Sequence, residues 1–318
     1  RGGAGADDAD PARRLVIAPG DEIVVTRAEH HANLVPWQEL AARTGASLRW
    51  LDLTEDGRID PTTVRVITER TRLLALTHAS NVTGAITPLV DILPAARAVG
   101  ALVVLDTCQS AAHLPLDFAA LHAAGVDAMV LSSHKMLGPT GIGALVAAEE
   151  LLEAMPPVLT GGSMIEVVRM ESSTYMSGPA RFEAGSQPLA QAAGWRTAVD
   201  YLSGLGMDRL HAGELDLMQR VLDGLAALDG VRVLGPADTR ERLGVVAFTV
   251  DGVHPHDVGQ VLDASGVAVR TGHHCAQPIH AHFSVSSSAR VSFGVTTTAG
   301  EVDRFLEAAA GVRAYFQR

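Results

Sequence analysis

The sequence predicts an α/β protein in which a large domain built on a mostly parallel sheet is followed by a smaller α+β domain. Short apolar runs alternate with helical patterns through the first 195 residues. Several of these runs are continuously apolar, which is typical of parallel strands that are covered on both faces. From about Ala193 the order changes to long helices followed by mixed strands and helices. We therefore place the large domain at residues 1–195 and the small C-terminal domain at residues 196–318.

The strands of the large domain are predicted from their apolar runs, and the helices from apolar residues at helical spacing between them. Residues 1–20 are polar and rich in glycine, and we expect a mobile loop there. The predicted strands are residues 22–26, 47–51, 73–77, 102–106 and 128–131. The predicted helices are residues 32–44, 61–68, 89–99 and 118–123.

In the small domain, two helical patterns run to Leu228 with an interruption at residues 204–206. Glycine at both ends of that interruption favours a break between two helices. Strands are predicted at 231–234, 245–250, 267–270 and 289–293, with a helix at 255–264 and a closing helix from Ala299.

Composition excludes several classes of function. The formal net charge is -11, which argues against nucleic acid or an anionic membrane as the partner. No apolar run is long enough to span a bilayer. The chain has only two cysteines, Cys108 and Cys275, and such sparing use fits a reducing compartment. We expect a cytoplasmic protein.

Three polar clusters follow predicted strands, at residues 77–81, 106–109 and 132–135. Because ligands of parallel sheets bind beyond the carboxyl ends of the strands, these clusters predict a common crevice. Lys135 follows an apolar strand, where a lysine is unusual unless its amine is used, for example to form a Schiff base. The alternative is a surface lysine in a loop. Asp106 likewise suits either the crevice or a helix cap.

Cys275 lies in a short polar loop beside histidines and Arg270, surroundings that favour a thiolate. A structural cysteine and a metal ligand are the alternatives. Imidazole and thiolate groups would suit zinc, but their spacing follows no zinc template. The histidines and cysteine of this cluster are His273, His274, Cys275, His280 and His282.

Five motifs occur in the order found in SufS-type, group II cysteine desulfurases of the class V aminotransferase superfamily, and the chain resembles this family from about Gly20 to its end. The resemblance implies the fold type I architecture of pyridoxal 5'-phosphate (PLP) enzymes. The motifs are EHHANLVPWQ (29–38), HASNVTGAI (78–86), SSHKMLGPTGIG (132–143), RFEAG (181–185) and RTGHHCAQP (270–278).

The resemblance implies a role for each matching residue at the cofactor. Lys135 is similar to the lysine that forms the Schiff base and moves the Cα proton. The other cofactor-binding residues would be Asp106 at the pyridine nitrogen, Gln109 at the phenolic oxygen, His30 stacked on the ring as a catalytic residue, Asn81 at cofactor and substrate, and Ser132 and His134 at the phosphate.

The resemblance also implies how substrate and partners are bound. Arg290, with Arg270 and Asn81, resembles the residues that bind the substrate, because a guanidinium suits a carboxylate. Cys275 would form the persulfide, whereas Cys108 would pack near the cofactor. Thr174 resembles a threonine that reaches the phosphate of the partner subunit, which implies a homodimer. L-cysteine would be the substrate and a SufE- or SufU-type protein the sulfur acceptor in iron–sulfur cluster assembly by the SUF system.

Two departures from the family keep alternatives open. Relatives carry a further segment ahead of the point at which this sequence starts, including a helix whose N-terminus helps bind the phosphate. Residues 296–298 are three threonines where relatives often have Tyr-Asn-Thr. The alternatives are a selenocysteine lyase, another class V lyase, or a truncated cofactor-poor relative that acts by protein interaction.

Overall fold

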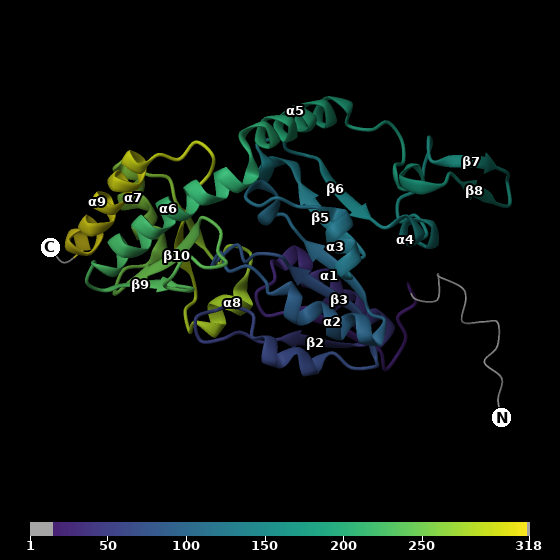
Figure 1. Ribbon diagram of the computed structural model, residues 1–318, viewed down its shortest axis with the longest axis horizontal. Helices are drawn as coiled ribbons and strands as arrows, with labels where there is room; N and C mark the ends of the chain where they lie inside the picture. Colours follow the sequence, from purple (N-terminus) through teal and green to yellow (C-terminus); the bar gives the residue numbers. More distant parts are fainter. Residues whose placement is uncertain (1–14, 317–318) are drawn as a thin grey trace.

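The computed structural model describes residues 15–316, so most of the predicted N-terminal loop lies outside the described residues. Within them, six strands form one sheet in the order β2-β1-β3-β4-β5-β6 (Figure 1). All neighbours are parallel except β5 and β6, which are antiparallel. The predicted mostly parallel sheet is confirmed. Its strands are β1 (Glu22–Thr26), β2 (Ser47–Leu51), β3 (Thr71–Thr77), β4 (Leu102–Asp106), β5 (Ala128–Ser132) and β6 (Gly143–Ala147).

The helices between the parallel strands end where the sequence places a glycine. Gly45, Gly100 and Gly125 each cap a helix in the left-handed conformation, with φ of 77°, 67° and 116°. Glycine adopts this conformation without steric cost, so the chain can turn back toward the sheet. The helices are α1 (Val35–Thr44), α2 (Leu89–Val99) and α3 (Phe118–Ala124).

Two predicted helices were partly wrong. Residues 32–44 divide into a 3-10 turn, η2 (His31–Asn33), and α1, and residues 61–66 form the 3-10 helix η3 (Pro61–Val66). In η2 the side chain of His30 accepts a hydrogen bond from the backbone of Ala32, which fixes a tight turn before α1 begins.

A second sheet is antiparallel and has the order β11-β12-β10-β9. The predicted strand at 267–270 was displaced, because the backbone N–H of Val267 bonds the carbonyl of Leu262 and closes the end of the preceding helix. Pairing with β12 therefore begins only at Arg270. The elements are β9 (Val231–Leu234), β10 (Val245–Val250), α7 (Pro255–Ala264), β11 (Arg270–Gly272), α8 (Gln277–His282), β12 (Ser288–Ser292) and α9 (Ala299–Phe316).

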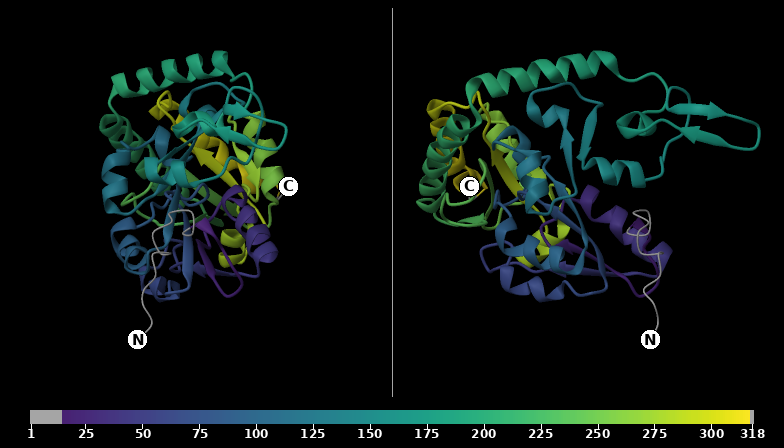
Figure 2. Two further views of the ribbon diagram at one scale, coloured as in Figure 1. Left: turned by 90° about the vertical axis from the view of Figure 1, so that its right-hand side faces the viewer. Right: turned by 45° about the vertical axis from the view of Figure 1, so that its right-hand side comes forward.

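Two helices connect the sheets. Helix α5 (Leu189–Leu205) and helix α6 (Met207–Ala226) meet at Gly206, where φ is 86°. Figure 2 shows α5 running from the second sheet toward a projecting hairpin. The predicted boundary at residue 195 falls inside α5 and stays a prediction. The projecting part contains α4 (Glu149–Ala154), β7 (Ile165–Val168) and β8 (Ser173–Tyr175).

One apolar core is built mainly from β3, β4 and α2 and also includes residues of β9, β10 and α8. A second core is built from β10, α6, α7 and α9. Loops that leave the carboxyl ends of β1, β3, β4 and β5 face strands β11 and β12 of the second sheet. Among residues 15–316, no helix has both the length and the apolar character that crossing a membrane requires.

Candidate active site

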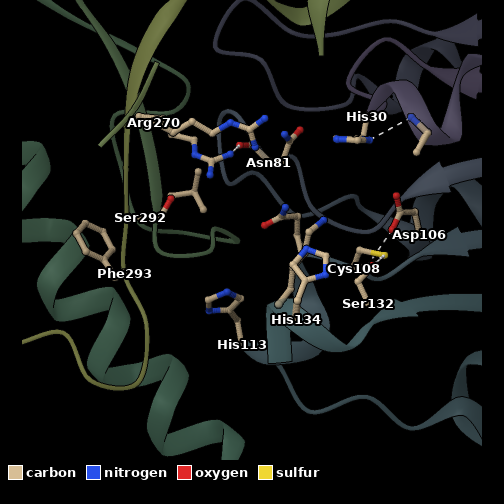
Figure 3. Close-up of a pocket in the computed structure, with 15 residues that line it drawn as sticks. His30, Asn81, Asp106, Cys108, His113, Ser132, His134, Arg270, Ser292 and Phe293 are labelled. Atoms are coloured by element: carbon tan, nitrogen blue, oxygen red, sulfur yellow. Dashed lines mark hydrogen bonds between the residues drawn. The ribbon is translucent and has the colours of Figure 1, made fainter. Parts of the chain in front are cut away.

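A cavity of about 520 Å³ lies between the two sheets, where the carboxyl ends of β3, β4 and β5 meet β12 (Figure 3). This size is typical of a small-molecule site. Nine of the predicted site residues line the cavity, and they come from loops far apart in the sequence. These residues are His30, Asn81, Asp106, Gln109, Ser132, His134, Lys135, Arg270 and Arg290.

Lys135 reaches the cavity because the chain turns sharply after β5. Residues Ser133–Met136 form a 3-10 turn, and Leu137 follows in the left-handed conformation with φ of 61°. A Cβ atom on Gly138 would meet the Ser133 hydroxyl and would lie 3.1 Å from the Ser133 carbonyl, so the close turn favours glycine at this position. The turn leaves Lys135 half-buried on the cavity wall.

Asp106 lies at the end of β4 and accepts a hydrogen bond of 2.9 Å from the backbone N–H of Cys108. The thiol of Cys108 is 3.1 Å from the Ser132 hydroxyl. Burial, followed by the charge of Asp106, raises the pKa of Cys108 to about 11. Cys108 therefore stays a neutral thiol at the cavity wall and is a poor nucleophile.

His30 faces the cavity as a neutral ring. Its Nδ1 accepts a hydrogen bond of 3.1 Å from the backbone of Ala32. Burial, followed by the nearby charge of Lys135, lowers the pKa of His30. A neutral imidazole held at one nitrogen presents a flat face to a ligand.

The loop that carries His30 is anchored by a buried carboxyl group. Glu29 is completely buried, and three donors converge on it. Burial raises the pKa of Glu29 to about 8, although these hydrogen bonds oppose the shift. The donors are the Thr26 hydroxyl at 2.6 Å, the Asn33 amide at 2.7 Å and the Thr77 backbone N–H at 2.8 Å.

Two arginines from the second sheet line the opposite wall. Arg290 Nη1 donates to the carbonyl of Asn81 at 2.8 Å, which ties β12 to the loop after β3. Burial, followed by the charge of Arg270, lowers the pKa of Arg290 to about 10, so Arg290 remains a cation at neutral pH. Figure 3 shows Arg270 and Asn81 on the same side of the cavity.

Cys275 lies beside the cavity, with its Sγ 3.5 Å from Nη2 of Arg270. The backbone here is left-handed at two consecutive residues, with φ of 52° at His274 and 57° at Cys275. Both carbonyls are held from the first sheet: Asn81 Nδ2 donates to His274 at 2.6 Å, and the His31 N–H donates to Cys275 at 2.7 Å. Residues 273–276, which we call the thiol loop, are therefore fixed to the loops that form the cavity.

The structure does not bring Thr174 to the cavity. This residue is exposed on β8, in the projecting hairpin. Within residues 15–316, no three His, Cys, Asp or Glu side chains come together in a way that could hold a metal ion.

Sequence reasoning missed a further histidine on the cavity wall. His113 lines the cavity, and its Nδ1 lies 2.8 Å from both carboxylate oxygens of Glu214, which is buried on α6. A signal was present, since Glu214 is a charged residue in the apolar stripe of α6 that also contains Met218 and Leu225. A second signal was that His113 follows Gln109 by only four residues, which places it close to the polar cluster predicted to line the crevice.

The cavity fits the PLP group that the sequence resemblance implies. A carboxylate and an amine line the same space, as a pyridinium nitrogen and an aldehyde require. Two buried polar atoms on its walls, Oδ1 of Asn81 and Nε of Arg290, have no partner within the described residues. Buried polar groups are seldom left unpaired, so this arrangement suits a polar ligand.

Comparison with known proteins agrees with this geometry. The family model "Aminotransferase class-V" matches residues 9–305. A protein of Mycobacterium leprae named "Probable cysteine desulfurase 2" is 52% identical over 299 residues, covering 94% of this chain and 71% of that protein. A "Probable cysteine desulfurase" of Streptomyces coelicolor is 47% identical, covering 93% of this chain and 70% of that protein.

Solved structures extend the likeness to three dimensions. The cysteine desulfurase CsdA of Escherichia coli superposes with a TM-score of 0.90 at 36% identity, covering 96% of this chain and 75% of that chain. A C-DES variant with glycine covalently linked to its PLP cofactor has a TM-score of 0.80 at 25% identity. The match covers 95% of this chain and 78% of that chain. The fold is thus that of PLP-dependent enzymes, and the chain belongs to the class V aminotransferase family.

Proposed function

We propose that this protein is a PLP-dependent cysteine desulfurase, which converts L-cysteine to L-alanine and leaves a persulfide on Cys275. The observation that carries the proposal is the placement of the Cys275 thiol beside Arg270, at the edge of a cavity that also contains Lys135 and Asp106. The names of the similar proteins from M. leprae and S. coelicolor support it.

The residues around the cavity divide the binding of the cofactor among them. Lys135 would bond to its aldehyde, and Asp106 would hold a proton on its ring nitrogen. When bound, PLP supplies an electron sink that allows a proton to leave the α-carbon of an amino acid. The neutral ring of His30 would lie against the cofactor ring, Gln109 would donate to the phenolic oxygen, and Ser132 and His134 would hold the phosphate.

Substrate binding and proton transfer use the remaining residues. The Arg290 guanidinium would pair with the substrate carboxylate, and its Nε, which has no partner among residues 15–316, supports this role. Asn81 would orient the same substrate beside Arg290. The amine of Lys135, once released, would take the proton from the α-carbon and return it at a later step.

In the sulfur transfer, the Cys275 thiolate attacks the sulfur of the substrate. An S–S bond forms, the C–S bond of the substrate breaks, and the electron pair of that bond stays on carbon, which is then protonated. The sum is L-cysteine plus the Cys275 thiol giving L-alanine plus the Cys275 persulfide. No external oxidant or reductant is needed.

We further propose the SufS-type assignment, on the strength of the short RTGHHCAQP loop. A homodimer would use Thr174, whose exposure on the projecting hairpin leaves it accessible to a second subunit. A SufE- or SufU-type acceptor would then receive the sulfur for iron–sulfur cluster assembly. The sparing use of cysteine supports a cytoplasmic location.

The test compares two single-cysteine variants. Cys275→Ala should abolish alanine formation from L-cysteine while cofactor still binds, whereas Cys108→Ala should still form a persulfide that mass spectrometry finds on the Cys275 peptide. Retained cysteine turnover in Cys275→Ala would refute the desulfurase mechanism. If that variant still released selenide from selenocysteine, a selenocysteine lyase would be the better assignment.

The lysine is tested separately by borohydride reduction of the cofactor-loaded protein. The mass of the reduced cofactor should be found on the tryptic peptide that contains Lys135. In Lys135→Ala no peptide should carry this mass. Lys135 is the only lysine in the sequence, so a wild-type protein that binds the cofactor but carries no label on this peptide would show that the assignment is wrong.

A further inference from the structure

Three buried side chains form a hydrogen-bonded row behind the thiol loop. The hydroxyl of Ser288, on β12, lies 2.9 Å from Nε2 of His274 and 3.0 Å from Nε2 of His280. The other ring nitrogen of His280, Nδ1, lies 2.9 Å from the carbonyl of Ala276. All three side chains are at least 98% buried, since their exposed fractions are 2%, 1% and 0% for His274, His280 and Ser288.

The direction of every hydrogen bond in this row follows from the carbonyl of Ala276, at which the row ends. A carbonyl oxygen only accepts, so Nδ1 of His280 carries a proton and, in the neutral ring, Nε2 accepts. The Ser288 hydroxyl therefore donates to His280, and its oxygen accepts from Nε2–H of His274. His274 is left with an unprotonated Nδ1, and this atom is buried without a partner among the described residues.

Both rings are neutral in this arrangement. A second proton on His274 would be a buried, unpaired donor beside two cations, Arg290 and Arg270. Burial, followed by the charge of Arg290, lowers the pKa of His274 to about 3. Burial also lowers the pKa of His280. The row is thus fixed in one protonation state across the neutral range.

The row bears directly on the thiol loop, because His274 immediately precedes Cys275. Two consecutive left-handed residues are costly for side chains other than glycine and persist only where their surroundings hold them. The loop carbonyls are held from the first sheet, while Ser288 holds the ring of His274 from the second sheet. The helix α8 is joined to the same row through His280 and Ala276.

We propose that Ser288 and His280 are positioning residues that set the tautomer of His274 and thereby hold the Cys275 thiol in its attacking position. The inference rests on the proposed role of Cys275. Neither residue lines the cavity, so they act on sulfur transfer and not on the binding of substrate or cofactor. Ser288 supplies the one hydroxyl that can accept from one ring while it donates to the other.

The first test observes the row without any change of residue. In protein labelled with ¹⁵N-histidine and loaded with cofactor, long-range ¹H–¹⁵N spectra distinguish the two neutral tautomers. We expect the Nε2–H form for His274 and the Nδ1–H form for His280, with assignments from His274→Gln and His280→Gln. The same tautomer at both rings, or a cationic ring at pH 7, would overturn the proposal.

The second test removes the hydroxyl. Ser288→Ala should lower kcat for sulfur transfer about tenfold, as expected for the loss of one well-placed hydrogen bond, and should leave KM for L-cysteine and the cofactor content unchanged. Ser288→Thr should restore kcat because it returns a hydroxyl. Ser287→Ala is the matched control, since no hydrogen bond of the neighbouring Ser287 hydroxyl is found within residues 15–316.

The positioning role of Ser288 and the role of the Cys275 thiol are refuted by different results. Wild-type kcat in Ser288→Ala, combined with an inactive Cys275→Ala, would refute only the positioning role. Full activity of Cys275→Ala would refute the role of the thiol itself, whatever Ser288→Ala does. A fall in cofactor content or a rise in KM in Ser288→Ala would show that the residue supports the cavity as a whole, and would also refute the positioning role.

Discussion

Arg270 Nη2 lies 3.5 Å from the Sγ of Cys275, five positions further along the chain. The Nη2 group donates to the sulfur, and its positive charge lies beside the atom that attacks a substrate. Arg270 is exposed, so solvent weakens the interaction. We predict that Arg270→Ala slows alkylation of Cys275 at pH 7 by about fivefold, which corresponds to about 1 kcal/mol.

The measurement is the rate of iodoacetamide labelling of the Cys275 peptide by mass spectrometry. Arg270→Lys should keep most of the rate because it keeps the charge. Arg304→Ala, which removes an exposed arginine on α9, serves as the control. An alkylation rate in Arg270→Ala equal to that of the wild type would mean that the guanidinium does not assist attack by the sulfur.

His113 and Glu214 form a buried pair that joins the cavity wall to α6. The side-chain exposures are only 14% and 5%. Removal of one partner leaves a buried carboxylate unpaired, so His113→Leu should lower the free energy of unfolding by about 3 kcal/mol. The double variant His113→Leu with Glu214→Leu should regain much of that loss, because two apolar groups need no partner.

Urea unfolding of the wild type, both single variants and the double variant gives the coupling between the two side chains. A double variant no more stable than the sum of the single changes would contradict the pairing. The pairing would also be contradicted if His113→Leu lowered the free energy of unfolding by less than about 0.5 kcal/mol, which is typical of surface substitutions.

The strands of the first sheet could be predicted closely from the sequence because they are short, continuously apolar and bounded by turn residues. Strand β4 begins at Leu102 and ends at Asp106, as predicted. Strand β6 was missed because Gly143–Ala147 follows a glycine-rich turn and has no polar alternation that would set it apart. The hairpin of β7 and β8 was missed because its strands are only four and three residues long and are largely exposed.

The candidate site could be predicted where residues follow strands, since parallel strands deliver their ends to one edge. Asp106 and Lys135 are of this kind. The Glu214 carboxylate, in contrast, reaches His113 across 101 residues of sequence. The hydroxyl of Ser288 was missed for a similar reason, since a serine in a run of three serines gives no sign that it joins two histidines.

Glu29 should make stability depend on pH. Its pKa is raised to about 8 in the folded protein, against an ordinary value of 4.5 in the unfolded chain. Between these values the folded state holds a proton that the unfolded state has released. Stability contributed by this group is therefore fully present below pH 4.5 and is lost as pH rises toward 8.

We predict that Glu29→Gln flattens the decline of unfolding free energy between pH 5 and pH 8, whatever its effect on the absolute level. Urea unfolding at four pH values compares the slopes of the two proteins. The amide will also oppose the Asn33 donor, so only the slope is diagnostic. Equal slopes would show that Glu29 is ionised in the folded protein, held so by its three hydrogen-bond donors.

Arg290 should determine the affinity for the substrate carboxylate. Its Nη1 is used by Asn81, while Nε is buried without a partner among residues 15–316. A lysine at this position keeps the charge but loses the planar fork that pairs with two carboxylate oxygens. We predict that Arg290→Lys raises KM for L-cysteine about tenfold and changes kcat much less, since one charged hydrogen bond contributes about 1.5 kcal/mol. Steady-state kinetics check this split, and Arg290→Met, which also removes the charge, should raise KM further. A KM of Arg290→Lys equal to that of the wild type would place the carboxylate elsewhere in the cavity, with Arg270 as the next cation to test.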